Sequence, residues 1–170
     1  METTMQLTKC EIKSPIGPIT VVIESGTIII CEFSDRDGRV SRQLDQYYPE
    51  AKVVEDECPE AIKTVFDRYF AGDRDALDAL SSAPMGTEFE RRVWAELKNI
   101  KAGTTDSYGS MAKRLNSSAR AVGRANGRNP VALIHPCHRV IGADGSLTGY
   151  AGGLERKEWL LTHEKSLLAM

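Results

Sequence analysis

The pattern of the sequence changes near Ser81, and this change is what most constrains the fold. Before it, the β-branched runs Ile19–Ile23 and Thr27–Phe33 are separated by Glu24-Ser25-Gly26, a pattern typical of a β-hairpin. Helical periodicity follows over residues 40–48 and 60–70, and after residue 86 helical patterns prevail. The sequence therefore predicts an α+β protein.

We expect two domains of unlike composition. Residues 1–80 are predicted to form a small α/β N-terminal domain, a few-stranded antiparallel sheet plus helices, and residues 81–85 a linker. Residues 86–170 are predicted to form a mainly helical C-terminal domain. The charge changes at the same place: residues 1–80 hold 9 Lys/Arg against 16 Asp/Glu, a net charge of −7, whereas residues 81–170 hold 13 against 8, a net charge of +5.

The C-terminal domain is predicted to begin with a capped helix. Thr87 and Glu90 have the spacing of a capping box, in which each side chain bonds the other residue's backbone N–H. Apolar residues then recur at helical spacing and predict a core face, with Trp94 packed beside it. The face consists of Phe89, Val93, Leu97 and Ile100.

Two short helices with a tight turn between them are predicted next. Ser107 can cap a helix that runs to Leu115, and Ser118 can cap a second helix that runs to Asn126 or Gly127. Such a pair is typical of a helix-turn-helix. Three arginines at i, i+4 and i+8 share one face if the second helix continues far enough; they are Arg120, Arg124 and Arg128.

A basic stripe surrounds this helix pair. No Asp or Glu occurs between Asp106 and Asp144, whereas six cations do: Lys113, Arg114, Arg120, Arg124, Arg128 and Arg139. A local basic stripe in an acidic protein suggests that a polyanion docks there. On spacing alone, a merely solvated face fits the three helical arginines equally well.

The composition excludes several classes of protein. No apolar run approaches the roughly 20 residues of a membrane helix, and the first residues lack the pattern of a secretory signal, so we expect a cytoplasmic protein without a membrane partner. The cysteines and histidines lack zinc-site spacing, so no metal is expected. A disulfide framework is also not expected, and three cysteines are interpreted as core or surface thiols: Cys10, Cys31 and Cys58.

The segment Pro136-Cys137-His138-Arg139-Val140 is the strongest chemical signal. A cysteine is a strong nucleophile only as the thiolate, and a nearby imidazole or guanidinium lowers the thiol pKa. Cys137 is therefore predicted to be a nucleophile. The alternative for an isolated Cys-His pair is a buried structural cysteine beside a polar turn.

This segment, extended to Ile141, resembles the active-site signature of the O6-alkylguanine-DNA alkyltransferases, a family of DNA repair proteins. Further matches flank it at consistent spacing over about residues 84–165. They include Gly86-Thr87-x-Phe89, Val93-Trp94, Ser107-Tyr108-Gly109, Ala119-Arg120-Ala121-Val122-Gly123, Asn129-Pro130, Gly149-Tyr150-x-Gly152-Gly153 and Lys157-Glu158-Trp159-Leu160-Leu161-x-His163-Glu164. The N-terminal part matches weakly, through residues 14–18 and 69–72.

The resemblance implies a catalytic set. Cys137 would accept an alkyl group irreversibly, His138 would take the thiol proton through a water, and Glu164 would orient His138 and stabilise its imidazolium. Tyr108 would hydrogen-bond the guanine and help to neutralise the charge that develops on the leaving base. Asn129 would hold the turn between recognition helix and active site.

The resemblance also implies how DNA is held. Residues that would bind the base, mostly through backbone groups, are Cys137, Val140, Ala151 and Gly152, together with Tyr108. Arg120 would enter the duplex in place of a flipped nucleotide, beside Ala121. Arg124 and Arg128 would contact phosphates. Double-stranded DNA carrying O6-alkylguanine is the expected partner of a monomer that needs no cofactor, with O4-alkylthymine as a second candidate lesion.

The sequence departs from the family pattern at three places. His135 stands where the family usually has an apolar residue. It could couple to the active site, but we expect it to be a partly exposed bystander. Ala151 takes a position that is often serine, and the turn at 116–118 lacks the commoner glycine and proline. None of these changes removes a catalytic role.

Two other functions fit parts of the pattern. A helix-turn-helix regulator would bind DNA without chemistry, but it has no need for a Cys-His-Glu set and would normally bind as a dimer. A cysteine hydrolase would use the same three residues but not the arginine stripe. Alkyl transfer from DNA to the protein accounts for both features.

Overall fold

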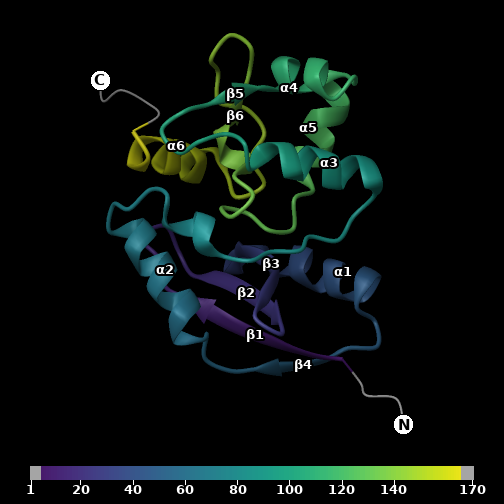
Figure 1. Cartoon of the computed structure of the whole chain (residues 1–170), viewed down its shortest axis with the longest axis vertical. Helices are drawn as coiled ribbons and strands as arrows, with labels where there is room; N and C mark the ends of the chain where they lie inside the picture. The colour runs from purple at the N-terminus through teal and green to yellow at the C-terminus, as the bar shows by residue number, and fades with distance from the viewer. Residues whose placement is uncertain (1–4, 166–170) are drawn as a thin grey trace.

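The computed structural model describes residues 5–165, and they form a sheet-containing N-terminal part and a mainly helical C-terminal part (Figure 1). The sheet has the strand order β3-β2-β1-β4. Its strands are β1 (Gln6–Ile12), β2 (Ile19–Glu24), β3 (Thr27–Phe33) and β4 (Lys52–Glu55). Two helices accompany it, α1 (Asp37–Tyr47) and α2 (Glu60–Phe70), with the 3-10 turns η1 (Ser34–Arg36) and η2 (Ala76–Ala79). The α+β prediction is confirmed.

The sheet is mixed rather than wholly antiparallel. β1 pairs antiparallel with β2 and β2 with β3, as the hairpin pattern predicts. β4, however, pairs parallel with β1. The expectation of an antiparallel sheet was wrong at this strand, because a crossover through α1 returns the chain in the direction of β1. β1 and β4 themselves were not predicted, since charged side chains interrupt their apolar pattern.

Both faces of the sheet are covered, which explains why β2 and β3 are almost continuously apolar. One face carries Val22, Ile29 and Ile30, which pack with Val40 of α1. Alternate residues on the other face belong to the large core that includes α2 and the C-terminal helices. The C-terminal part, which contains the Pro-Cys-His motif, therefore packs directly on the sheet.

Main-chain hydrogen bonds connect the outer edge of β3 to the C-terminal part. Ile28 N donates to Ser81 O, and Ala83 N donates to Ile28 O, each at 2.9 Å. Further along β3, Cys31 bonds in the same way to Pro130 O and Ala132 N, also at 2.9 Å. The segment expected to be a linker therefore pairs with the sheet, and so does the segment that leads into the Pro-Cys-His motif.

The C-terminal part contains the three predicted helices and a fourth helix near its end. They are α3 (Glu88–Leu97), α4 (Tyr108–Arg114), α5 (Ala119–Gly127) and α6 (Leu154–His163), with the short strands β5 (Asp106–Ser107) and β6 (Val140–Ile141) and the 3-10 turn η3 (Cys137–Arg139). The capping box at Thr87 is present, and Ser107 and Ser118 cap α4 and α5 as expected. The last helix, α6, ends at His163.

A disulfide joins Cys10 of β1 to Cys58, just before α2, across a sequence separation of 48 residues. The prediction that both are free thiols was wrong. Scattered cysteines gave no spacing signal, and only the tertiary packing of α2 beside β1 brings the two Cα atoms to 5.1 Å. Cys31 and Cys137 are free and buried.

Among residues 5–165, no helix is both long and apolar enough to span a membrane.

Candidate active site

Cys137 begins the turn η3 in the middle of the C-terminal part and is 5% exposed. Its backbone is held from two sides. Cys137 N donates to His135 O at 2.8 Å, and Asn126 of α5 donates through Nδ2 to Cys137 O at 3.2 Å. The thiol is thus fixed relative to the second helix of the helix-turn-helix.

His138 and Glu164 form a buried pair, as the resemblance implies. Nε2 of His138 lies 2.9 Å from Oε2 of Glu164, and neither side chain is exposed. Because a carboxylate oxygen accepts, Nε2 carries the proton and Nδ1 is left with its lone pair. Nδ1 is buried and has no hydrogen-bond partner within residues 5–165. A neutral histidine with a free basic nitrogen follows the cysteine directly.

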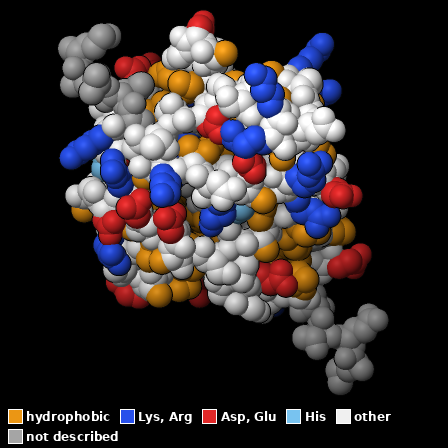
Figure 2. Space-filling model, turned by 45° about the horizontal axis from the view of Figure 1, so that its top comes forward, with side chains coloured by type: hydrophobic (Ala, Val, Ile, Leu, Met, Phe, Trp, Pro, Cys, Tyr) orange, Lys and Arg blue, Asp and Glu red, His pale blue; other side chains and the backbone are white. Residues whose placement is uncertain are grey.

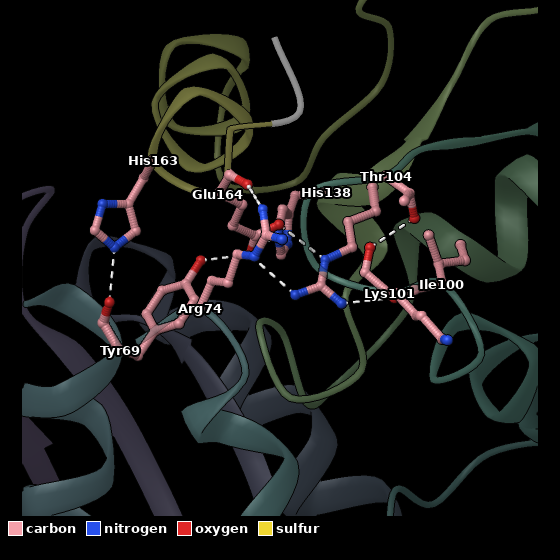
Figure 3. A network of polar contacts seen from close by, with 9 residues as sticks. Tyr69, Arg74, Ile100, Lys101, Thr104, His138, His163 and Glu164 are labelled. Carbon is pink, nitrogen blue, oxygen red and sulfur yellow. Dashed lines mark hydrogen bonds and ion pairs between the residues drawn. The ribbon is translucent and has the colours of Figure 1, made fainter. Parts of the chain in front are cut away.

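Two further side chains hold the Glu164 carboxylate, and a third holds its main-chain oxygen (Figure 3). The Tyr69 hydroxyl donates to Oε2 at 2.6 Å, and Arg139 donates from Nε to Oε1 at 2.9 Å and from Nη2 to Oε2 at 3.0 Å. Arg74 donates to the main-chain oxygen of Glu164 at 3.0 Å. Burial acts to raise the pKa of Glu164, but His138 and Arg139 more than offset it and hold the pKa well below its usual range. Glu164 is therefore a fixed anion.

The resting cysteine and histidine are both neutral. Burial raises the pKa of the Cys137 thiol to about 11, with a hydrogen bond from Asn129 opposing the rise. Burial also lowers the pKa of His138, although Glu164 acts against this. The thiolate is therefore formed only when a proton is removed, and His138 is unprotonated and able to take it.

Tyr108 stands at the start of α4, and its hydroxyl faces residues 148–153, a glycine-rich segment that precedes α6. The hydroxyl donates to Thr148 O at 3.2 Å and to Gly149 O at 3.3 Å. Burial raises the pKa of Tyr108, so the phenol keeps its proton at neutral pH. Both of these hydrogen bonds are long, so the phenol can turn to donate to a base placed beside it.

The other residues expected to contact the base lie on two segments, one that follows the cysteine and one that the Tyr108 hydroxyl contacts at Gly149. Val140 directly follows η3 and is buried; Ala151 is half-buried, and Gly152 is buried against Phe33 and Tyr150. Lys157 of α6 connects these segments, because Nζ donates to Val140 O at 2.5 Å and to Thr148 O at 2.7 Å.

Asn129 makes the turn-holding contacts expected of it. Nδ2 donates to His135 O at 2.8 Å, and Oδ1 accepts from Val131 N at 3.0 Å. The side chain thus closes the turn between α5 and the active-site segment.

His135 is not a partly exposed bystander, so that prediction was wrong. It is 5% exposed. Nδ1 donates to Trp94 O at 2.9 Å, and Nε2 lies 2.9 Å from the Ser82 hydroxyl, from which it accepts in this tautomer. Both polar partners come from segments distant in sequence, so no local pattern indicated that a buried histidine would find hydrogen-bond partners here.

The arginines of the predicted stripe divide into two groups. Arg120 and Arg124 are exposed on α5 and make no ion pair with another described residue, whereas Ala121 between them is half-buried. α5 ends at Gly127, so Arg128 lies just past the helix, where it is 3.7 Å from Glu90.

Two members of the predicted basic stripe are already paired with carboxylates. Arg114 pairs with Glu96 and Asp106, and buried Arg139 bonds Glu164, so neither is a free cation for a polyanion. Figure 2, turned so that the α4–α5 end comes forward, shows Lys and Arg side chains spread over this face with acidic side chains beside several of them. Within the described residues, the second helix retains Arg120 and Arg124 as its unpaired cations.

Sequence reasoning missed four supporting residues: Tyr69, Asn126, Arg139 as a carboxylate ligand, and Lys157. Of these, Lys157 is fully buried without an acidic partner among residues 5–165, and burial lowers its pKa to about 8. The sequence offered one signal for Lys157, which is that this lysine lies on the same helical face as the apolar residues Leu160 and Leu161. Residues 5–165 hold no cluster of three or more His, Cys, Asp or Glu arranged to bind a metal.

Comparisons with known proteins agree with this geometry. Residues 88–166 match the family model for the DNA binding domain of 6-O-methylguanine DNA methyltransferase. A methylated-DNA–protein-cysteine methyltransferase of Shigella flexneri is 40% identical over 169 residues, covering 96% of this chain and 99% of the relative. One of Mycolicibacterium paratuberculosis is 46% identical over 161 residues, covering 91% and 90%. The crystal structure of Mycobacterium tuberculosis OGT in complex with DNA superposes with a TM-score of 0.76 at 37% identity, covering 95% of this chain and 93% of that one.

Proposed function

The chain belongs to the methylated-DNA–protein-cysteine methyltransferase family, and from this premise we propose that Cys137 is the residue that receives the alkyl group. The protein repairs DNA by moving an alkyl group from O6-alkylguanine to one of its own cysteines. The observation that carries the assignment is the buried His138–Glu164 pair with its free Nδ1, in the turn that holds the Cys137 thiol.

The reaction is a displacement at the alkyl carbon. A sulfur lone pair of Cys137 forms the new S–C bond while the C–O6 bond breaks and its electron pair goes to the guanine. The thiol proton passes to His138 Nδ1, through one water, and Glu164 stabilises the imidazolium that forms. Tyr108 donates to the leaving base and so offsets its negative charge. The leaving guanine then takes up a proton from water and the imidazolium gives its proton to water, so the products are a thioether on the protein, a neutral His138 and an intact guanine.

The proposed chemistry needs a flipped nucleotide. The alkyl carbon is out of reach inside a stacked duplex, and extruding a base costs a few kcal/mol. We assign Arg120 to the place of the expelled nucleotide because it is exposed at the start of α5. Arg124 is assigned to phosphate contact on the same face, and Arg128 to a weaker one because Glu90 lies beside it.

Base contacts are assigned to the segments around the thiol. We place the guanine between Tyr108 on one side and the backbone of Cys137, Val140, Ala151 and Gly152 on the other. Each thioether inactivates one molecule, because the reaction consumes the Cys137 thiol and no later step regenerates it. The protein is therefore expected to repair one lesion per chain.

The mass of the intact protein tests this function. After incubation with a duplex that carries one O6-methylguanine, the chain should gain one methyl group, and peptide mapping should locate it on Cys137. Cys137→Ala should bind the duplex and gain nothing. A regulator without chemistry would show no mass change, and a hydrolase would release product repeatedly instead of stopping at one per chain.

A further inference from the structure

Arg156 of α6 joins the N-terminal part to the main chain of the proposed base pocket. Its guanidinium carbon lies 4.1 Å from the centroid of the Phe33 ring. Nε donates to Ile16 O at 2.9 Å, and Nη1 donates to Asp35 Oδ1 at 3.0 Å and to Gly152 O at 3.2 Å. The side chain is 18% exposed, so these contacts are largely shielded from water.

Two glycines leave room for this arrangement. A Cβ on Gly152 would lie 2.8 Å from the Phe33 ring and 2.7 Å from the Tyr150 ring. Gly17 has a φ of +112°, and a Cβ there would lie 2.9 Å from Nη2 of Arg156. The guanidinium therefore lies between the turn at Gly17 and the ring of Phe33, in a place from which a Cβ at residue 17 would displace it.

The same glycine-rich segment is held at its other end by different residues. Thr148 O accepts from Lys157 Nζ at 2.7 Å and from the Tyr108 hydroxyl at 3.2 Å. Ala151 lies between this anchor and the one at Gly152. The segment that would meet the edge of the base is thus fixed at both ends, and Arg156 supplies the connection to the sheet.

We propose that Arg156 is a positioning residue that pre-orders the Gly149–Gly153 segment for the guanine base, so that Phe33 and the turn at Gly17 contribute to base binding. The inference rests on the proposed function, in which Ala151 and Gly152 hold the base. A segment rich in glycine loses more conformational entropy on ordering than other segments do. If the segment is already ordered, binding the base does not incur that cost.

The contacts of Arg156 indicate that it affects the binding of the base and not the reaction at sulfur. None of its hydrogen bonds reaches Cys137, His138 or Glu164. Removing the guanidinium should therefore weaken the hold on the base and leave the reactivity of the bound base unchanged. If Arg156 contributed only to general stability, its removal would not weaken base binding while leaving the reactivity of the bound base unchanged.

Single-turnover alkylation by a free O6-benzylguanine base measures both quantities. The rate rises with base concentration to a limit, which gives a half-saturating concentration and a limiting rate. For Arg156→Gln we expect the half-saturating concentration to rise about tenfold, with the limiting rate within about twofold of the original.

Arg156→Lys should also bind the base more weakly, since an ammonium cannot stack flat on Phe33 or make the same set of hydrogen bonds. Arg68→Gln, which removes an arginine from an exposed ion pair with Asp73 on the N-terminal part, is the matched control and should change neither quantity.

A second variant tests the connection from the far side. Gly17→Ala changes no residue of the C-terminal part, yet its methyl group would displace the Arg156 guanidinium and should weaken base binding in the same way. In the double variant with Arg156→Gln, the added effect of Gly17→Ala on base binding should vanish, because no guanidinium remains to be displaced. Thermal unfolding of each variant shows that the folded protein is being measured.

Two results would overturn the inference. One is an unchanged half-saturating concentration in folded Arg156→Gln, and the other is a fully additive effect of the two substitutions. Failure of the proposed function is a separate outcome, because the unsubstituted protein would then acquire no alkyl group on Cys137 from a methylated duplex.

Discussion

The Tyr69 hydroxyl, on α2 of the N-terminal part, donates a 2.6 Å hydrogen bond to the Glu164 carboxylate at the end of α6. The same carboxylate oxygen also faces His138. The proposed proton relay therefore extends beyond the C-terminal motif and includes a residue 95 positions away in sequence. The N-terminal part thus has a direct connection to the chemistry in addition to its packing.

Replacing Tyr69 by Phe should slow alkyl transfer moderately. The change deletes one buried hydrogen bond to a charged group, an interaction worth about 1.5–3 kcal/mol. We expect a loss of stability of this order and a reduction in transfer rate of about tenfold, because Glu164 then holds His138 less firmly. Denaturant unfolding and single-turnover transfer from methylated duplex measure the two effects. A transfer rate equal to that of the unsubstituted protein would limit Tyr69 to a structural role.

Glu164→Gln should slow transfer far more, by about two to four orders of magnitude. A neutral amide cannot stabilise the imidazolium. Its NH₂ group can also donate to Nε2 of His138, and this favours the tautomer in which Nδ1 carries the proton and cannot accept one. Arg139 would also lose its buried partner, at a cost to stability of about 3–5 kcal/mol. Transfer must therefore be measured at a temperature where the variant is folded. An undiminished transfer rate in the folded variant would remove Glu164 from the mechanism.

Acid should destabilise the protein through the same carboxylate. The pKa of Glu164 is held below its unfolded value, so Glu164 contributes stability that is fully present above pH 4.5, the ordinary value. This contribution is lost as the pH falls toward the lowered pKa of the folded state. Glu164→Gln should show a smaller loss of stability on acidification between about pH 5 and pH 2. Equal losses in the two proteins would mean that other carboxylates govern acid unfolding.

The rate at which Cys137 reacts with a simple alkylating agent should depend on pH differently from that of an ordinary thiol. Its pKa is raised to about 11, so the thiolate fraction should keep rising about tenfold per pH unit through pH 9 and pH 10. Alkylation by iodoacetamide should follow this rise, whereas a peptide thiol should level off above its pKa of about 8.5. Transfer from methylated duplex should depend on pH much less near neutrality, because His138 removes the proton within the reaction. A level rate with iodoacetamide above pH 9 would contradict the raised pKa.

The disulfide between Cys10 and Cys58 should contribute to stability and not to repair. A bridge that closes a loop of this length is worth about 2–4 kcal/mol. Cys58→Ala should therefore lower the midpoint of thermal unfolding under non-reducing conditions and leave the alkyl group on Cys137. A reducing agent should bring the unsubstituted protein close to the variant. Equal midpoints of the two proteins without reductant would show that the bridge does not stabilise the fold.

Local signals predicted what depends on local structure. The caps at Thr87, Ser107 and Ser118 predicted where α3, α4 and α5 begin, because each cap bonds a backbone N–H of its own first turn. The helical pattern of α3 was extended too far, to Ile100, whereas the helix ends at Leu97. The pairing of His138 with Glu164 came from the family resemblance, since nothing in the local sequence joins residues 26 positions apart.

Interactions set by tertiary packing could not be predicted from the sequence. The burial of His135 depends on Ser82 and the Trp94 carbonyl, and the parallel pairing of β4 depends on the crossover through α1. The disulfide depends likewise on how α2 lies beside β1. In each case the partner is distant in sequence and carries no pattern of its own.

Arg120 should act in nucleotide flipping and not in the chemistry at sulfur. It is exposed near the start of α5, on the opposite side of that helix from the buried residues Val122 and Asn126 that face the core and η3. Two substrates separate the roles: an alkylated duplex requires flipping, whereas a free O6-alkylguanine base does not. Arg120→Ala should react much more slowly with the duplex and almost normally with the free base. Arg124→Ala is the matched control, because losing a phosphate contact should weaken duplex binding in a salt-dependent way without slowing the reaction of bound duplex. An equal loss for Arg120→Ala on both substrates would mean that Arg120 shapes the active site instead.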